Sequence, residues 1–206
     1  MSKSILPSRP PPSIITPMDK GTIIARALAK LGNRQYQTAA GTQDPAEQHF
    51  ADVLLECNAA EDWSFCRAKT SIERSQSGIY PIPVDCLRIT RVSTADDRDM
   101  LPHGFELCNG HLEARDYTDP ITLRYIRRLL PHSGGTPDTP QFNNYIIALL
   151  AARIAPQIIG GAEGQQLADK YTQEAELARS RAIYHDRAQD RANDQRPRIG
   201  KHYQPY

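Results

Sequence analysis

The sequence PQFNNYIIALLAARIAPQII, residues 140–159, is a strongly apolar segment from which the rest of the fold can be worked out. Its apolar side chains and alanines cover much of the circumference of a helix, and such a helix must be surrounded by other elements. We therefore predict that this segment is the central, most buried helix, and that it ends at Gly160 and Gly161. Its large apolar residues are Phe142, Tyr145, Ile146, Leu149, Leu150, Ile154 and Ile158.

Three further segments have helical periodicity. The first is predicted over 19–31, and Gly32 stands where a C-terminal cap belongs. The second begins after Asp44, a residue type that suits an N-cap, and is expected to end near Trp63. The last covers about 163–194 and has a thin apolar stripe that needs partner surface to be fully buried. The residues of this stripe are Leu167, Tyr171, Ala175, Ala178 and Ala182.

The region between the second and third helices changes to the alternation typical of strands. Strand candidates are residues 65–72, 78–83, 86–94, 105–112 and 121–129. Asn109-Gly110 is the strongest hairpin signal, and a slip in alternation near Arg91 predicts a β-bulge. The short turns between the candidates favour an antiparallel meander.

These elements predict an α+β fold, a four-helix bundle with an inserted small antiparallel β domain and extended N- and C-terminal arms. The expected units are a Pro-rich arm (1–18), the first part of the bundle (19–64), a β-rich insertion (65–135), the second part of the bundle with the long last helix (136–195) and a docking tail (196–206). Six residues are expected to act as structural core anchors within or between these units: Trp63, Phe65, Tyr80, Pro81, Pro83 and Phe142.

Composition excludes several classes of function. The 206 residues contain 25 Lys and Arg against 24 Asp and Glu, so a globally basic nucleic-acid binder is not expected. No apolar run is long enough to span a membrane, and the N-terminus has no leader-like apolar segment. The four dispersed cysteines, Cys57, Cys66, Cys86 and Cys108, are interpreted as reduced thiols, and their spacing does not suit zinc.

Catalytic motifs are missing from the sequence. It contains no HExxH, GxSxG, P-loop or GxGxxG pattern. The acids from Asp96 to Asp99 are more typical of a solvated turn than of a metal clamp, and Cys66 beside Arg67 is a weak nucleophile candidate. We therefore expect a protein that is not an enzyme and that uses no cofactor or metal.

The C-terminal segment is the best candidate for an interface. Between residues 179 and 201, basic residues outnumber acidic ones by seven to three. On a helix the aspartates, four residues apart, form one stripe and the arginines an adjacent one. The stripes could be a solvated face or could pair with those of an identical neighbour in a ring, and the tail could dock on a partner protein or contact nucleic acid. The candidate residues for an interface with a partner or with another subunit are Asp186, Arg187, Asp190, Arg191, Asp194, Arg196, Arg198, Lys201, His202, Tyr203 and Tyr206.

Several short pieces resemble a known family when they are taken in order. They are the helix end AKLG at 29–32, AEDWSF at 60–65, YPIPVDCLRI at 80–89, Tyr125 in a strand, PQF at 140–142 followed by ALLAARIA at 148–155 and Gly160, and a closing helix with Tyr171. Over about 20–195 this pattern resembles the tail tubular protein A family, the head-to-tail adaptors of tailed bacteriophages.

The resemblance implies a non-enzymatic virion protein made in the host cytoplasm. It implies a ring, of twelve subunits in that family, between the portal protein and the tail nozzle or tail tube, with genomic DNA passing non-specifically through the lumen and no contact with a membrane. It also implies that the C-terminal segment engages the portal.

Other functions stay open at this stage. One is a nucleic-acid-binding module that uses the basic segment 187–206, and another is a tail-completion protein at a different joint. An enzyme that uses His111 or the acids Asp96–Asp99 is the third.

Overall fold

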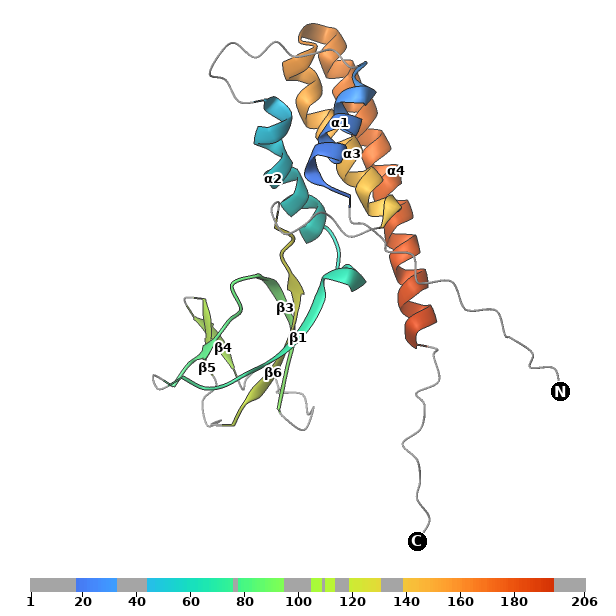
Figure 1. Ribbon diagram of the computed structural model, residues 1–206. Helices are drawn as coiled ribbons and strands as arrows, with labels where there is room; N and C mark the ends of the chain where they lie inside the picture. Colours follow the sequence, from blue (N-terminus) through green and yellow to red (C-terminus); the bar gives the residue numbers. More distant parts are fainter. Residues whose placement is uncertain are drawn as a thin grey trace, which may run out of the picture.

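The computed structural model describes residues 18–32, 44–75, 78–94, 105–108, 110–113, 119–130 and 139–194. Several predictions lie outside these residues: the arm 1–17, the loop 33–43, the acids Asp96–Asp99, Asn109, most of the 130–140 linker and the tail from 195 onward. In the described part the α+β class is confirmed. Two helices precede and two follow an insertion of two small three-stranded antiparallel sheets, which lie below the helices in Figure 1.

The helices are α1 (Lys20–Lys30), α2 (Pro45–Ala59), α3 (Pro140–Ile158) and α4 (Gly161–Asp194). Helix α3 contacts each of the other three, and its most extensive contact is with α4. The predicted central helix is therefore confirmed, but the arrangement is an α3–α4 pair with the shorter α1 and α2 against α3 (Figure 1).

Caps define where the first two helices begin. The carboxylate of Asp19 accepts a 2.8 Å hydrogen bond from the backbone amide of Thr22, and that of Asp44 accepts one of 2.9 Å from Ala46. These bonds satisfy amides that have no partner within the helix. Helix α2 ends at Ala59, before the expected Trp63, and the Trp63 indole N–H then donates to the carbonyl of Cys57 at 2.8 Å.

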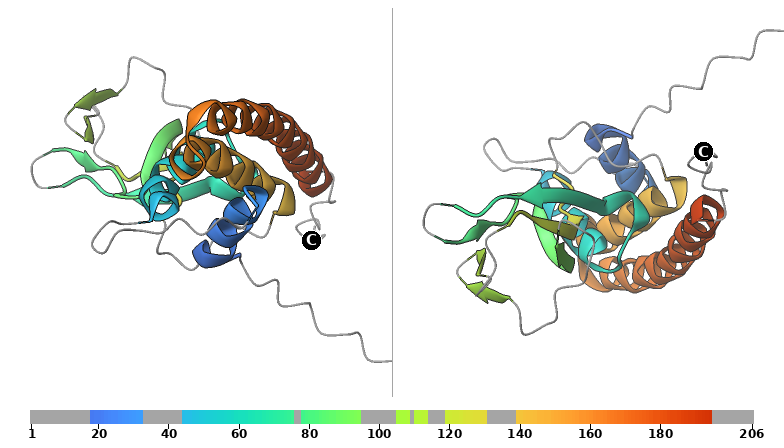
Figure 2. Two further views of the ribbon diagram at one scale, coloured as in Figure 1. Left: turned by 90° about the horizontal axis from the view of Figure 1, so that it is seen from above. Right: turned by 90° about the horizontal axis from the view of Figure 1, so that it is seen from below.

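Helix α4 lies close to α3 along a stripe of small residues. Tyr171, Ala175 and Ala182 of the predicted stripe are buried, and Leu167 and Ala178 are half-buried. Ala168, which was not predicted, is buried with them. At the start of α4, a Cβ on Gly164 would lie 3.1 Å from the Ala155 carbonyl oxygen, so the two backbones approach closely there. In the views from above and below, α4 curves around its partners (Figure 2).

The first sheet contains β1 (Arg67–Ile72), β3 (Cys86–Thr94) and β6 (Ile121–Arg127) in the order β1-β6-β3. The predicted meander is wrong, because the last strand lies between the first and the third. Burial explains the order: β6 has Ile121, Leu123 and Tyr125 on one face and Ile126 on the other, so it takes the central place. Register shifts at Cys86/Arg88 and Ile89/Arg91 confirm the bulge predicted near Arg91.

The second sheet contains β2 (Tyr80–Pro81), β4 (Glu106–Cys108) and β5 (His111–Glu113) in the order β2-β5-β4. The predicted hairpin is confirmed: β4 pairs with β5, and Gly110 between them has φ +78°, which glycine adopts without strain. The candidate strand 105–112 is thus two strands. Strand β1 begins at Arg67 because η1 (Ser64–Cys66), a single 3₁₀ turn, takes up the preceding residues.

Two apolar cores form. The helical core contains Trp63 and Phe142, with Phe65 packed against it, and Ile126 of β6 belongs to this core as well. The second core contains Tyr80 and side chains from both sheets. Of the other expected anchors, Pro81 is exposed and is therefore not part of a core, and Pro83 is half-buried. In the two-residue strand β2, alternation turns Tyr80 inward and Pro81 outward, which suits a proline on an edge strand.

Candidate functional site

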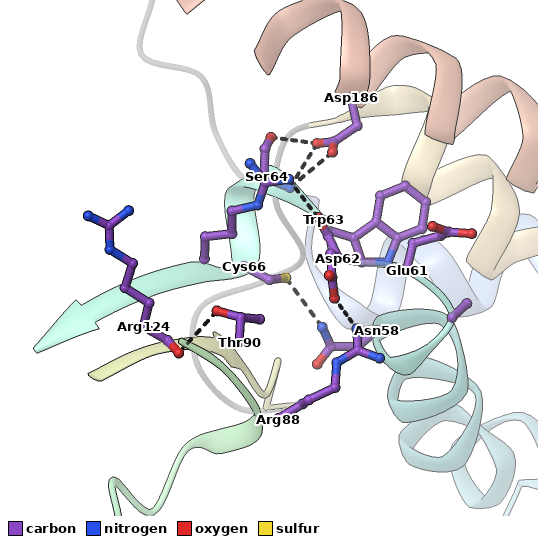
Figure 3. A network of polar contacts seen from close by, with 12 residues as sticks. Asn58, Glu61, Asp62, Trp63, Ser64, Cys66, Arg88, Thr90, Arg124 and Asp186 are labelled. Carbon is purple, nitrogen blue, oxygen red and sulfur yellow. Dashed lines mark hydrogen bonds and ion pairs between the residues drawn. The ribbon is translucent and has the colours of Figure 1, made fainter. Parts of the chain in front are cut away.

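Polar side chains gather where the helical part meets the first sheet, beside the C-terminal half of α4 (Figure 3). They come from the end of α2, from η1, from β1 and β3, and from α4. A cavity of about 320 Å³ lies among them. We call this group the junction cluster; its members are Glu61, Asp62, Ser64, Arg67, Arg88, Arg179, Asp186, Arg187 and Asp190.

The innermost contact of the junction cluster joins Asp186 to Ser64. The Asp186 carboxylate is buried, 7% exposed, and accepts hydrogen bonds from the Ser64 backbone amide at 3.0 and 3.2 Å and from the Ser64 hydroxyl at 2.6 Å. A charged acceptor with several donors is among the stronger hydrogen-bonded arrangements in proteins. This contact fixes α4 to η1, the turn that leads into β1.

Two arginines of the sheet turn toward acids of the helical part. Arg67 of β1 donates to Asp190 of α4 at 2.6 Å, and Arg88 of β3 pairs with Asp62. These side chains are about half exposed, so each pair contributes little stability by itself. Their role is to set the direction in which the sheet leaves the helices.

A third set of contacts ties α4 to the end of α2. Arg179 lies 3.4 Å from both the Ala60 carbonyl and the Glu61 carboxylate, and Arg187 lies 3.8 Å from the same carboxylate. Because a helix ends in carbonyls without helical partners, a cation at this place is favourable. Helix α4 is thus held by the end of α2, by η1 and by β1.

Aromatic and amide side chains pack on the buried side of the junction cluster. The ring of Trp63 stacks on Phe65 with centroids 5.7 Å apart, and both rings meet Phe142 edge-on at 5.0 Å. The buried Asn58 side chain donates to the Cys66 sulfur at 3.3 Å and accepts from the Leu129 amide at 2.9 Å. The junction is therefore packed and hydrogen-bonded on its inner side.

The side chains of the junction cluster hold α4, η1 and the first sheet in fixed positions, and the neighbouring Cys66 is not an activated nucleophile. Burial raises the pKa of the Cys66 thiol to about 12, although Arg127 and the Asn58 side chain act in the opposite direction, so this cysteine stays protonated and is a poor nucleophile. The pKa of Cys57 is also raised, chiefly by burial. Among the described residues, no group of His, Cys, Asp and Glu side chains could hold a metal ion.

Some of the predicted interface residues are engaged within the chain, one is exposed, and the side chains of the others lie outside the described residues. Asp186 and Asp190 are engaged by Ser64 and Arg67 of the same chain, and Arg187 by Glu61, while Arg191 is exposed. Asp194 ends α4, but its side chain and all of the tail candidates lie outside the described residues. The tail candidates are Arg196, Arg198, Lys201, His202, Tyr203 and Tyr206.

Sequence reasoning missed Ser64 and Arg67 as partners of α4, and Arg88 as the partner of Asp62. One signal was present: Asp186 continues the stripe Tyr171, Ala175, Ala178, Ala182 at a spacing of three to four residues. An acid on the buried stripe needs a donor, and this identifies it as an inward-facing residue. No sequence pattern indicated which residue would supply the donor.

The face of α4 that points away from the junction cluster has two large apolar residues that are exposed to solvent. Leu177 is 62% exposed and Tyr184 is 76% exposed, and their spacing of seven residues places them on one side of the helix. Leu177 also borders a groove of about 430 Å³ between α1, α3 and α4. It is lined by Lys30, Gln141, Asn144, Glu174, Leu177, Ala178 and Arg181.

Comparison with known proteins gives no assignment. No protein-family model matches the chain, and a search of curated proteins finds no match either. The described helices also contain none with both the length and the apolar content of a membrane-spanning segment.

Proposed function

We propose that this chain is a structural subunit of a ring that joins the portal to the tail of a tailed bacteriophage, with packaged DNA passing through the lumen. The observation that carries the proposal is the form of α4. With 34 residues it is about 50 Å long, against about 28 Å for the 19-residue α3, so α3 cannot cover all of it.

The exposed face of α4 is the proposed subunit contact. A helix that is fixed on one side by the junction cluster presents Leu177 and Tyr184 on the other in a defined direction. Exposed apolar residues beside a polar groove are typical of surfaces that another protein covers. A repeated contact of one surface with a different surface of the next copy forms a ring when the rotation between copies closes.

The remaining parts of the proposal come from the resemblance of the sequence to the tail tubular protein A family. They are a ring of twelve subunits, the four helices as one bundle, and a C-terminal segment that engages the portal. In this proposal the chain is not an enzyme, uses no cofactor, and resides at the head–tail junction of the virion. The element order, two helices, a β insertion and two helices, supports the proposal.

The test is assembly on a portal. The purified chain is mixed with the portal protein encoded by the same genome, and the product is weighed by native mass spectrometry. The proposal expects a complex that holds a full ring of this chain on one portal. A chain that never associates with the portal, or that binds only a tail protein, would contradict it.

A further inference from the structure

One face of the first sheet concentrates positive charge although the whole chain is nearly neutral. Register places Arg67, Lys69 and Ser71 of β1 opposite Ile126, Arg124 and Thr122 of β6. On the other side of β6, the same three residues Ile126, Arg124 and Thr122 are paired with Arg88, Arg91 and Ser93 of β3. Of these nine positions, five are Arg or Lys and none is acidic, whereas the chain as a whole has a net charge of +1.

Alternation separates this basic face from the apolar face of the same sheet. Ala68 and Ile72 of β1 and Leu123 and Tyr125 of β6 point into the second core. The cationic positions lie between them along the strands and therefore point the other way. We call the set Arg67, Lys69, Arg88, Arg91 and Arg124 the basic face.

Three of these cations form a single row across the strands. Lys69 and Arg91 are the register partners of Arg124 on its two sides, and neighbouring strands are about 5 Å apart. Like charges directly opposite each other in a sheet repel. The row therefore brings three positive charges together on one face of the sheet.

The basic face is accessible. Lys69 is exposed, Arg91 and Arg124 are half-buried, and the side chains of Arg67 and Arg88 are about half exposed. The acids Asp62 and Asp190 pair with Arg88 and Arg67 at the edge nearest the helices. In Figure 3, Arg88 turns toward Asp62, whereas the guanidinium of Arg124 lies well apart from that pair.

We propose that the basic face binds the sugar–phosphate backbone of duplex DNA without sequence preference. Four of its five cations are arginines, whose planar fork matches phosphate oxygens, and the hydroxyls of Ser71 and Thr122 lie in the neighbouring row. An acidic protein partner would instead need apolar or aromatic anchors. The one large apolar side chain on this face, Ile126, is buried in the helical core.

This inference does not rest on the ring. It concerns the free chain in solution and would hold for a monomer. It also assigns the contact to the sheet, and not to the basic C-terminal segment, so the two nucleic-acid hypotheses make different predictions.

The test measures binding of the full chain to a fluorescent mixed-sequence duplex as salt is raised from about 50 to about 200 mM. The main variant is Lys69→Gln with Arg124→Gln. We expect it to bind at least about tenfold more weakly at low salt and to lower the slope of log K against log salt by about 2, since two phosphate contacts are lost. A duplex of different sequence should compete equally well.

Two control variants remove charge elsewhere. Lys170→Gln with Arg181→Gln neutralises two cations of α4, and Arg196→Gln, Arg198→Gln and Lys201→Gln together neutralise the tail. We expect both to bind as the unaltered chain does. Thermal unfolding shows whether each variant folds, and the single change Lys69→Gln at an exposed position decides the question if the double variant does not fold.

Three results would overturn the proposal. One is a loss of binding in the tail variant but not in the sheet variants. Another is no binding to duplex, or a salt-independent binding. The third is tighter binding to polyglutamate than to duplex, which would make the basic face a protein contact.

Discussion

The carboxylate of Asp186 accepts hydrogen bonds from both the backbone amide and the hydroxyl of Ser64, a residue 122 positions earlier in the chain. Asp186 lies near the end of the longest helix, and Ser64 begins the turn into the first strand. One buried side chain thus connects α4 to the base of the β insertion. Asp186 is also one of the six members of the junction cluster that line the cavity.

Replacing Asp186 by Ala should destabilise the fold by about 2 kcal/mol, because two donors of Ser64 lose their acceptor. Urea unfolding measures the change. The matched control is Asp190→Ala, which removes the half-exposed partner of Arg67 and should cost less than about 1 kcal/mol. Equal losses for the two variants would show that Asp186 has no special part in the junction.

The aromatic group beneath the junction should be the most sensitive place in the helical core. Phe142→Ala removes a ring that is 1% exposed and that meets both Trp63 and Phe65, so we expect a loss of about 3–5 kcal/mol. Val84→Ala, at a position that is 99% exposed, should change stability by less than about 0.5 kcal/mol. Thermal unfolding of the two variants gives the comparison.

Gly164→Ala tests the close approach of α3 and α4. Alanine is the better helix former, but its Cβ would lie 3.1 Å from the Ala155 carbonyl oxygen, so we expect a net loss of about 1–2 kcal/mol. Ser180→Ala, an exposed position of the same helix, should be neutral or slightly stabilising. A stabilising Gly164→Ala would mean that the helices are farther apart.

Thiol reactivity should separate the cysteines into two classes. Burial raises the pKa of Cys66 to about 12 and raises that of Cys57 as well, so at about pH 8 both remain protonated in the folded protein. Raised thiol pKa values favour folding below the unfolded value near 9, and this contribution is lost as the pH rises toward 12. Iodoacetamide followed by peptide mass spectrometry should label these two only after unfolding, and Cys86 and Cys108, which are half-buried, before them.

The exposed face of α4 can be tested without disturbing the core. Tyr184→Glu places a charge at a position that is 76% exposed, so the monomer should keep its unfolding midpoint. If this face contacts the neighbouring subunit, the variant should fail to complete a ring on the portal. Leu107→Glu, at a similarly exposed position of β4, should assemble normally; a ring that tolerates Tyr184→Glu would place the subunit contact elsewhere.

Local signals in the sequence predicted elements well. Asp44 begins its helix as a cap, Gly110 turns the hairpin, and the slip near Arg91 is a register shift. Each of these depends on residues within a few positions, where hydrogen-bond geometry and backbone conformation are set by the residue type.

Long-range pairing could not be predicted in the same way. The place of β6 between β1 and β3 depends on which strand can bury both faces, and this is clear only once the helices cover Ile126. The sequence placed Asp186 and Asp190 on one stripe of the last helix but did not show that Ser64 and Arg67 face them. The basic face was missed for the same reason, because its charges come from three strands that are far apart in the chain.

The central claim, that this chain is a ring subunit at the head–tail junction, is tested most directly by its copy number. Quantitative peptide mass spectrometry of gradient-purified particles gives the number of copies relative to the portal protein. The proposal predicts a ratio near one to one. Absence of the chain from the particles would contradict it.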